Sequence, residues 1–146
     1  MKRTKSLASS HAPTLEEMNQ VLQETWDSLP QDFRALCPEL SLMGSEFPEE
    51  ELLEELECES AYELLGFFYG TDTHESPMMF ETEWFANTLR FFRRPILDYW
   101  AETGFSLKEV VTHVMVTEIG RHFGLSDHEL ALVEVAAGGR QTELLH

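Results

Sequence analysis

The 146-residue sequence has few positively charged residues and few cysteines. It holds 10 Lys and Arg against 27 Asp and Glu, for a formal net charge of −17, and only two cysteines. So acidic a surface repels the phosphate backbone of nucleic acids and the anionic headgroups of a membrane. Cys37 and Cys58 are too few for a disulfide scaffold and lack a CxxC spacing. We therefore expect neither a nucleic acid nor a membrane among the partners.

Long apolar runs are also missing. No run approaches the roughly 20 residues of a membrane-spanning helix. The first 13 residues include Lys2, Arg3 and Lys5 but no apolar stretch of the kind found in signal peptides. These features favour a cytoplasmic protein. The content of hydrophobic residues is nevertheless 42%, with ten Phe and three Trp, which is enough for the core of one domain.

The acidic residues are unevenly spread. Residues 6–89 hold 19 acidic residues and one basic residue, Arg34, whereas residues 90–146 hold eight acidic and six basic residues. The sequence therefore divides into a strongly acidic N-terminal part and a nearly neutral C-terminal part.

Apolar spacing and turn residues predict an α+β domain. Helices are expected over residues 14–29, 49–59, 93–103 and 106–123, and from residue 126 onward. Strands are expected near residues 40–43, 62–70 and 88–92, with a long loop over 71–86. We assign residues 1–13 to a mobile N-terminal tail, 14–136 to the domain, and 137–146 to a C-terminal tail.

The helix over residues 106–123 carries the motif with the clearest chemistry. Its apolar residues form one stripe at helical spacing. Residues 117–127 read TEIGRHFGLSD. With histidine at Thr117 and Arg121, the segment would contain the helix-borne HExxH zinc signature. Two histidines four residues apart lie on one helix face and can meet one Zn²⁺, while the glutamate polarises its water.

On these residues the chain resembles the minimal zincin-like metallopeptidases, small bacterial one-domain proteins with an HExxHxxGxxD pattern. The resemblance extends over about residues 12–135, through Leu29-Pro30-x-x-Phe33, the acidic stretch, Leu64–Gly70 and Phe92–Leu97. It implies a minimal zincin-like fold, in which a small β-sheet packs against helices. It also implies zinc-dependent hydrolysis of peptide bonds, with substrate beside an edge strand formed by residues 88–92 or 62–70.

The chain departs from this family at the residues the chemistry needs. The resemblance places the general base on Glu118, two helix ligands on Thr117 and Arg121, and a third ligand on Asp127. Threonine is a poor neutral zinc ligand, and arginine remains protonated at any ordinary pH. We therefore expect no metal and no cofactor in this chain, whereas active relatives use zinc.

Two interpretations of Arg121 remain open. In the first, Arg121 replaces the charge of the metal and pairs with Asp127, Glu118 or both. In the second, the site has decayed and Arg121 is an exposed residue favoured by the helix dipole. Substitute metal ligands would have to come from His113, His122 and His128, which lie on different helix faces.

The function favoured by the sequence is therefore a pseudoenzyme, a metallopeptidase-like protein that acts as a non-catalytic module binding an unknown peptide or protein. The alternatives are a zinc-dependent metallopeptidase with an altered metal site and an engineered inactive form of such an enzyme.

Overall fold

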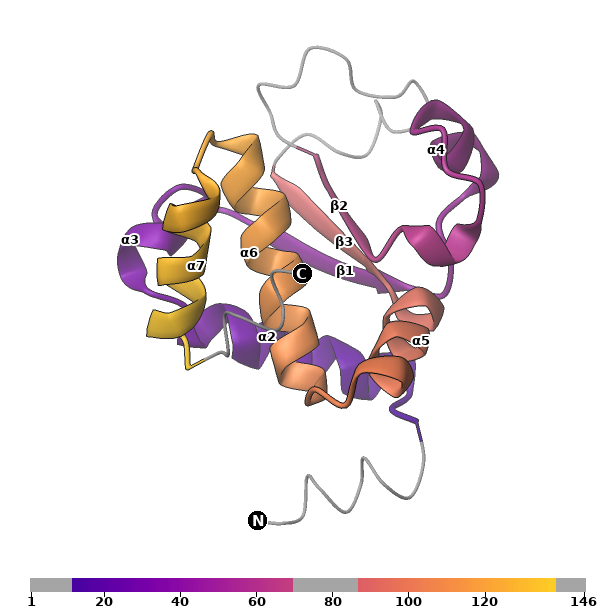
Figure 1. Cartoon of the computed structure of the whole chain (residues 1–146), viewed down its shortest axis with the longest axis horizontal. Coiled ribbons are helices and arrows are strands. Elements are labelled where there is room, and N and C mark those ends of the chain that lie inside the picture. Colours follow the sequence, from indigo (N-terminus) through magenta and orange to yellow (C-terminus); the bar gives the residue numbers. More distant parts are fainter. Residues whose placement is uncertain (1–11, 70–86, 139–146) are drawn as a thin grey trace.

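The structure, a computed structural model, describes residues 12–69 and 87–138. Its elements are α2 (Leu15–Ser28), α3 (Gln31–Arg34), β1 (Ser41–Ser45), α4 (Glu50–Glu55), the 3₁₀ helix η1 (Ala61–Glu63), β2 (Gly66–Tyr69), β3 (Thr88–Phe92), α5 (Arg93–Thr103), α6 (Leu107–His122) and α7 (Asp127–Ala136). The predicted α+β class is confirmed. Figure 1 shows α7 at one end of the molecule, α4 and α5 at the other, and α6 between them.

The three described strands form one sheet in the order β1-β3-β2. Strand β1 is parallel to β3, with Ser41 opposite Thr88, and β2 is antiparallel to β3, with Gly66 opposite Phe91. Among the described strands, β3 is therefore central and β2 lies at an edge. Of the two strands that the family resemblance offered as the edge strand, the one at residues 62–70 takes that position.

The two faces of the sheet are covered differently, because successive residues of a strand point to opposite faces. Leu89 and Phe91 of β3 belong to the main core, which is built largely with α2 and α6. Phe92 belongs to a smaller cluster with Leu52 of α4 and Tyr69 of β2. The acidic helix α4 is thereby attached to the sheet face opposite α6.

Helix α6 is the central helix of the fold. Ser106 and Glu109 form a capping box at the start of the predicted helix, and Gly124 follows the helix with φ of +84°, a conformation that favours glycine. The prediction of a single apolar stripe was too narrow, because α6 contacts α2, α5, α7, β2 and β3. Its buried residues accordingly lie on several sides of the helix: Val110, Val111, Thr112, Val114, Met115, Val116, Ile119 and Gly120.

Two glycines, Gly66 in β2 and Gly120 in α6 itself, allow neighbouring elements to pack closely against α6. A Cβ atom on Gly66 of β2 would lie 2.8 Å from Cγ1 of Val114, and a Cβ atom on Gly120 would lie 2.1 Å from Cδ2 of Leu130 in α7. These glycines let β2 and α7 pack directly against two neighbouring sides of the same helix.

Several sequence predictions need correction. The one-turn helix α3 was not predicted. The strand expected over residues 62–70 begins only at Gly66, because the Ser60 side chain accepts a hydrogen bond from the Tyr62 amide and starts η1 instead. The predicted loop at 71–86 lies outside the described residues, as do both predicted tails apart from residues 12–13 and 137–138.

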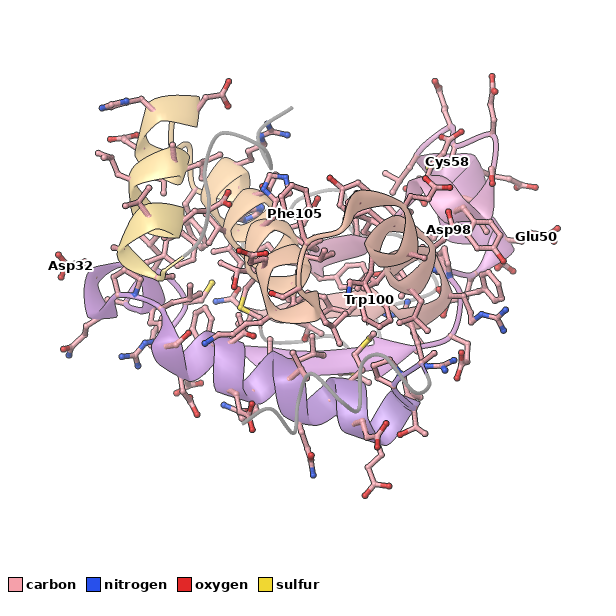
Figure 2. The ribbon with its side chains drawn as sticks, turned by 60° about the horizontal axis from the view of Figure 1, so that its bottom comes forward. Asp32, Glu50, Cys58, Asp98, Trp100 and Phe105 are labelled. Atoms are coloured by element: carbon pink, nitrogen blue, oxygen red, sulfur yellow. The ribbon has the colours of Figure 1, made fainter. Side chains whose placement is uncertain are left out.

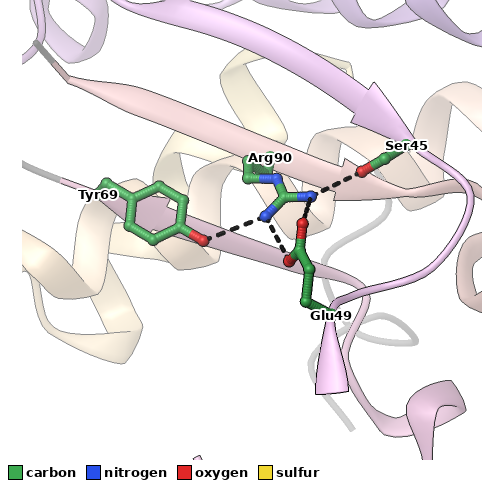
Figure 3. Close-up of polar contacts among 4 residues, drawn as sticks. All are labelled: Ser45, Glu49, Tyr69 and Arg90. Carbon is green, nitrogen blue, oxygen red and sulfur yellow. Dashed lines mark hydrogen bonds and ion pairs between the residues drawn. The ribbon is translucent and has the colours of Figure 1, made fainter. Parts of the chain in front are cut away.

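A buried arginine joins α4 to the sheet (Figure 3). Arg90 donates from Nη1 to Oε1 of Glu49 at 2.8 Å and from Nη2 to Oε2 at 2.9 Å. It also donates to the hydroxyls of Ser45, at 3.0 Å, and Tyr69, at 3.4 Å. Burial raises the pKa of Tyr69 to about 12, although the Arg90 charge opposes the shift. We assign this cluster a structural role, because it joins all three strands of the described sheet to the N-cap residue of α4.

Candidate functional site

The first row of side chains on α6 faces α7. His113, Thr117 and Arg121 follow one another at intervals of four residues, so they lie on one side of the helix. Nδ1 of His113 lies 3.0 Å from Oε2 of Glu134, and Nη2 of Arg121 lies 3.6 Å from Oδ1 of Asp127. Both carboxylates belong to α7. The row on which the family motif places its two helix ligands is therefore linked to α7 at each end.

The second row on α6 faces β2. Val114 lies against Gly66, and the ring of His122 makes an edge contact with Phe68, with 4.7 Å between centroids. Gly66 and Phe68 are two residues apart on one face of β2. Glu118 lies midway between Val114 and His122 along α6, so it occupies the same row, beside the edge strand.

Glu118 is a partly buried carboxylate with no hydrogen bond or ion pair in the part of the chain that the structure describes. Burial raises its pKa from an ordinary 4.5 to about 7, and the positive charge of Arg121 lowers it only in part. Burial removes solvation from this carboxylate, and no hydrogen bond or ion pair with a described residue replaces it, so the neutral form of Glu118 is favoured.

The Arg121–Asp127 pair lies at the surface. The side chains of Arg121 and Asp127 are 64% and 86% exposed, and the separation of 3.6 Å exceeds a normal hydrogen bond. Arg121 therefore approaches Asp127, as the first interpretation of this residue requires. Its exposure at a helix end also agrees with the second interpretation. Such exposed pairs contribute about 0–1 kcal/mol to stability.

The three histidines considered as substitute metal ligands do not converge. His113 is bound to Glu134, His122 packs against Phe68 and Phe123, and His128 is exposed on α7. Among residues 12–69 and 87–138, no group of three or more His, Cys, Asp or Glu side chains is placed to hold a metal ion.

The donor set at the motif also fits zinc poorly. Zinc sites in proteins use imidazole, thiolate and carboxylate ligands. The helix positions instead carry the Thr117 hydroxyl and the Arg121 guanidinium, and the guanidinium lies beside the Asp127 carboxylate that would serve as third ligand. A permanent cation at this point repels Zn²⁺ as well as failing to bind it.

Sequence reasoning missed Glu134, which is fully buried and has an Oε1 atom without a hydrogen-bond partner among the described residues. A signal was present, because Glu134 falls at helical spacing with the buried residues Leu130 and Ala131. It therefore lies on the inner stripe of α7. A carboxylate on such a stripe requires a partner, and His113 supplies it.

The profile of the zincin-like metallopeptidase family matches residues 37–137. The chain therefore belongs to the zincin-like metallopeptidase family. None of the curated proteins compared with the chain matches it. None of the described helices has the length and apolar character needed to cross a membrane.

Proposed function

We propose that this zincin-like protein does not hold a catalytic zinc ion and acts as a non-catalytic module that binds a peptide or a protein segment. The observation that carries the proposal is the position of Arg121, whose guanidinium lies 3.6 Å from Oδ1 of Asp127. By the family resemblance, Thr117, Arg121 and Asp127 occupy the three ligand positions of the active enzymes. Here a fixed cation takes the place of one ligand and lies beside another.

The surface that would bind a partner is the edge strand β2 together with the α6 residues beside it. An extended peptide can add to a sheet edge through main-chain hydrogen bonds, while neighbouring side chains supply specificity. Glu118 and His122 lie beside this strand and are partly exposed. In this proposal a peptide binds beside β2 without any metal chemistry.

Zinc-dependent thermal stability tests the proposal. A ligand that binds only the folded state increases the free energy of unfolding, by about 2.7 kcal/mol when its concentration is a hundred times Kd. The melting temperature rises accordingly. We expect the same melting temperature in excess EDTA and in a slight excess of ZnCl₂. A melting temperature that rises with zinc, and no longer does so in His113→Ala or His122→Ala, would instead show an altered metal site. Zinc-dependent hydrolysis of a peptide mixture would also contradict the proposal.

A further inference from the structure

We propose that Glu118 recognises a lysine or arginine side chain of a peptide bound beside β2. This inference rests on the proposed function and adds the chemical class of the partner. It gives the glutamate of the motif a recognition role that is independent of any metal.

The position of Glu118 supports a contact with a bound segment. It lies between Val114 and His122 on the row of α6 that faces β2, and both flanking residues contact that strand. Within the described sheet, β2 has β3 on one side and no strand on the other. A chain that extended the sheet at β2 would therefore pass close to the Glu118 carboxylate.

The described residues supply only part of the charge that would satisfy Glu118. The carboxylate has no hydrogen bond or ion pair with the described residues, and the nearest cation in sequence, Arg121, belongs to the neighbouring row and lies beside Asp127 on α7. Glu118 is partly buried, and a charge–charge contact is stronger in such surroundings than in water. An amine or guanidinium from outside would give Glu118 the partner that it lacks.

The charge of the whole chain favours the same kind of ligand. A net charge of −17 attracts cationic peptides over long range and speeds their encounter with the surface. Long-range attraction alone does not select one residue of a peptide, whereas a single unpaired carboxylate beside an edge strand does. The inference therefore predicts one basic residue at a fixed position, in addition to a general preference for positive charge.

Peptide selection tests this inference. Random heptapeptides displayed on phage would be selected against the immobilised full-length chain, its Glu118→Gln variant and an Asp98→Asn control. Asp98 is an exposed acidic residue on α5, and Figure 2 shows it near Glu50 and Cys58, at the end of the molecule away from α7. We expect Lys or Arg at one position in the peptides selected by the unmodified chain and by Asp98→Asn, and loss of that enrichment with Glu118→Gln.

The binding affinity of a selected peptide then measures the strength of its contact with Glu118. Replacing its fixed Lys by Gln should weaken binding about ten- to a hundredfold to the unmodified chain and by less than about threefold to Glu118→Gln, as in a double-mutant cycle. Glu118→Asp, which shortens the reach of the carboxylate, should keep part of the preference and serves as a second variant should Glu118→Gln fail to fold.

The possible failures are distinguishable. Selected peptides without a fixed basic residue, or an unchanged preference in Glu118→Gln, would overturn this inference and leave the proposed function standing. Failure to select any peptide would contradict the binding role itself, and zinc-dependent stabilisation would contradict the proposed loss of the metal.

Discussion

Nδ1 of His113 on α6 and Oε2 of Glu134 on α7 lie 3.0 Å apart, and the Glu134 side chain is fully buried. Eight residues further along α6, Arg121 approaches Asp127 of α7 at the surface. The two contacts connect the same pair of helices, one in the interior and one in solvent. Thr117 lies midway between them on α6, so the row that carries the metal ligands in the family motif is here a helix–helix contact.

The buried contact should matter most for stability. His113→Leu leaves the Glu134 carboxylate buried without its partner, and we expect a loss of about 2–4 kcal/mol in the free energy of unfolding. The double variant His113→Leu, Glu134→Leu removes both polar groups and should recover much of that loss. Urea unfolding, monitored by circular dichroism, measures the free energy of unfolding of the single and the double variant. Equal losses in the single and double variants would show that the pair carries no coupling energy.

The exposed contact provides the matched control. Arg121→Met should change the free energy of unfolding by less than about 1 kcal/mol, because both members of its pair are solvated. A loss as large as that of His113→Leu would mean that Arg121 holds the helices together, contrary to the geometry.

Glu118 should make stability depend on pH. Its folded-state pKa of about 7 lies above its ordinary value of 4.5, so the folded state holds a proton that the unfolded state releases. Stability should therefore fall as pH rises from about 4.5 to about 7 and level off above that range. Glu118→Gln should remove this dependence and be more stable at pH 8 by about 1–3 kcal/mol.

The urea midpoint of both proteins at pH 5 and pH 8 measures this effect. Arg121→Met should raise the pKa of Glu118 further, because it removes the charge that lowers it, and a carbon-13 NMR titration of the carboxyl group would follow the change. A Glu118 carboxyl that titrates at its ordinary value would refute the desolvation described above.

The Glu49–Arg90 pair should respond to pH in the opposite direction. Partial burial alone would raise the pKa of Glu49, but the hydrogen bond and charge of Arg90 and a backbone hydrogen bond outweigh it, and the pKa is lowered. The stability that this group contributes is thus present above pH 4.5 and lost as pH falls below it.

A neutral substitution tests the Glu49–Arg90 pair at constant pH. We expect Glu49→Gln to cost about 1–3 kcal/mol at pH 7, since Arg90 is 5% exposed and loses its bidentate partner. Glu50→Gln, at the next and exposed position, should be nearly neutral. Similar losses of stability in the two variants would point to a general effect of charge on the acidic segment. The bidentate pair would then make no contribution of its own to stability.

Local patterns predicted the helices well, because their signals lie within a few residues. The capping pairs Thr14–Glu17 and Ser106–Glu109 begin α2 and α6 at the starts of the ranges predicted for them, and Gly104 and Gly124, both with positive φ, follow the predicted helix ends at residues 103 and 123. The 3₁₀ helix η1 escaped prediction because the aromatic residues around it have high strand propensity, while a hydrogen bond to Ser60 decides the local structure.

Contacts between distant segments could not be predicted in this way. The Arg90–Glu49 bond joins residues 41 positions apart, and the His113–Glu134 bond joins residues 21 positions apart. Each depends on how whole elements pack, and a pattern within one element does not specify it. The sequence did identify Arg121 and Asp127 as candidate partners, because a motif spanning one helix end and the next helix start places them close together.

Metal content tests the central claim most directly. The unmodified chain and the double variant Thr117→His, Arg121→His would be purified in parallel, dialysed against one buffer with limiting zinc, and analysed by inductively coupled plasma mass spectrometry. The double variant restores two imidazoles four residues apart on α6 and removes the cation beside Asp127. We predict about one zinc per chain in the double variant and none in the unmodified chain. One zinc per chain in the unmodified protein would contradict the account.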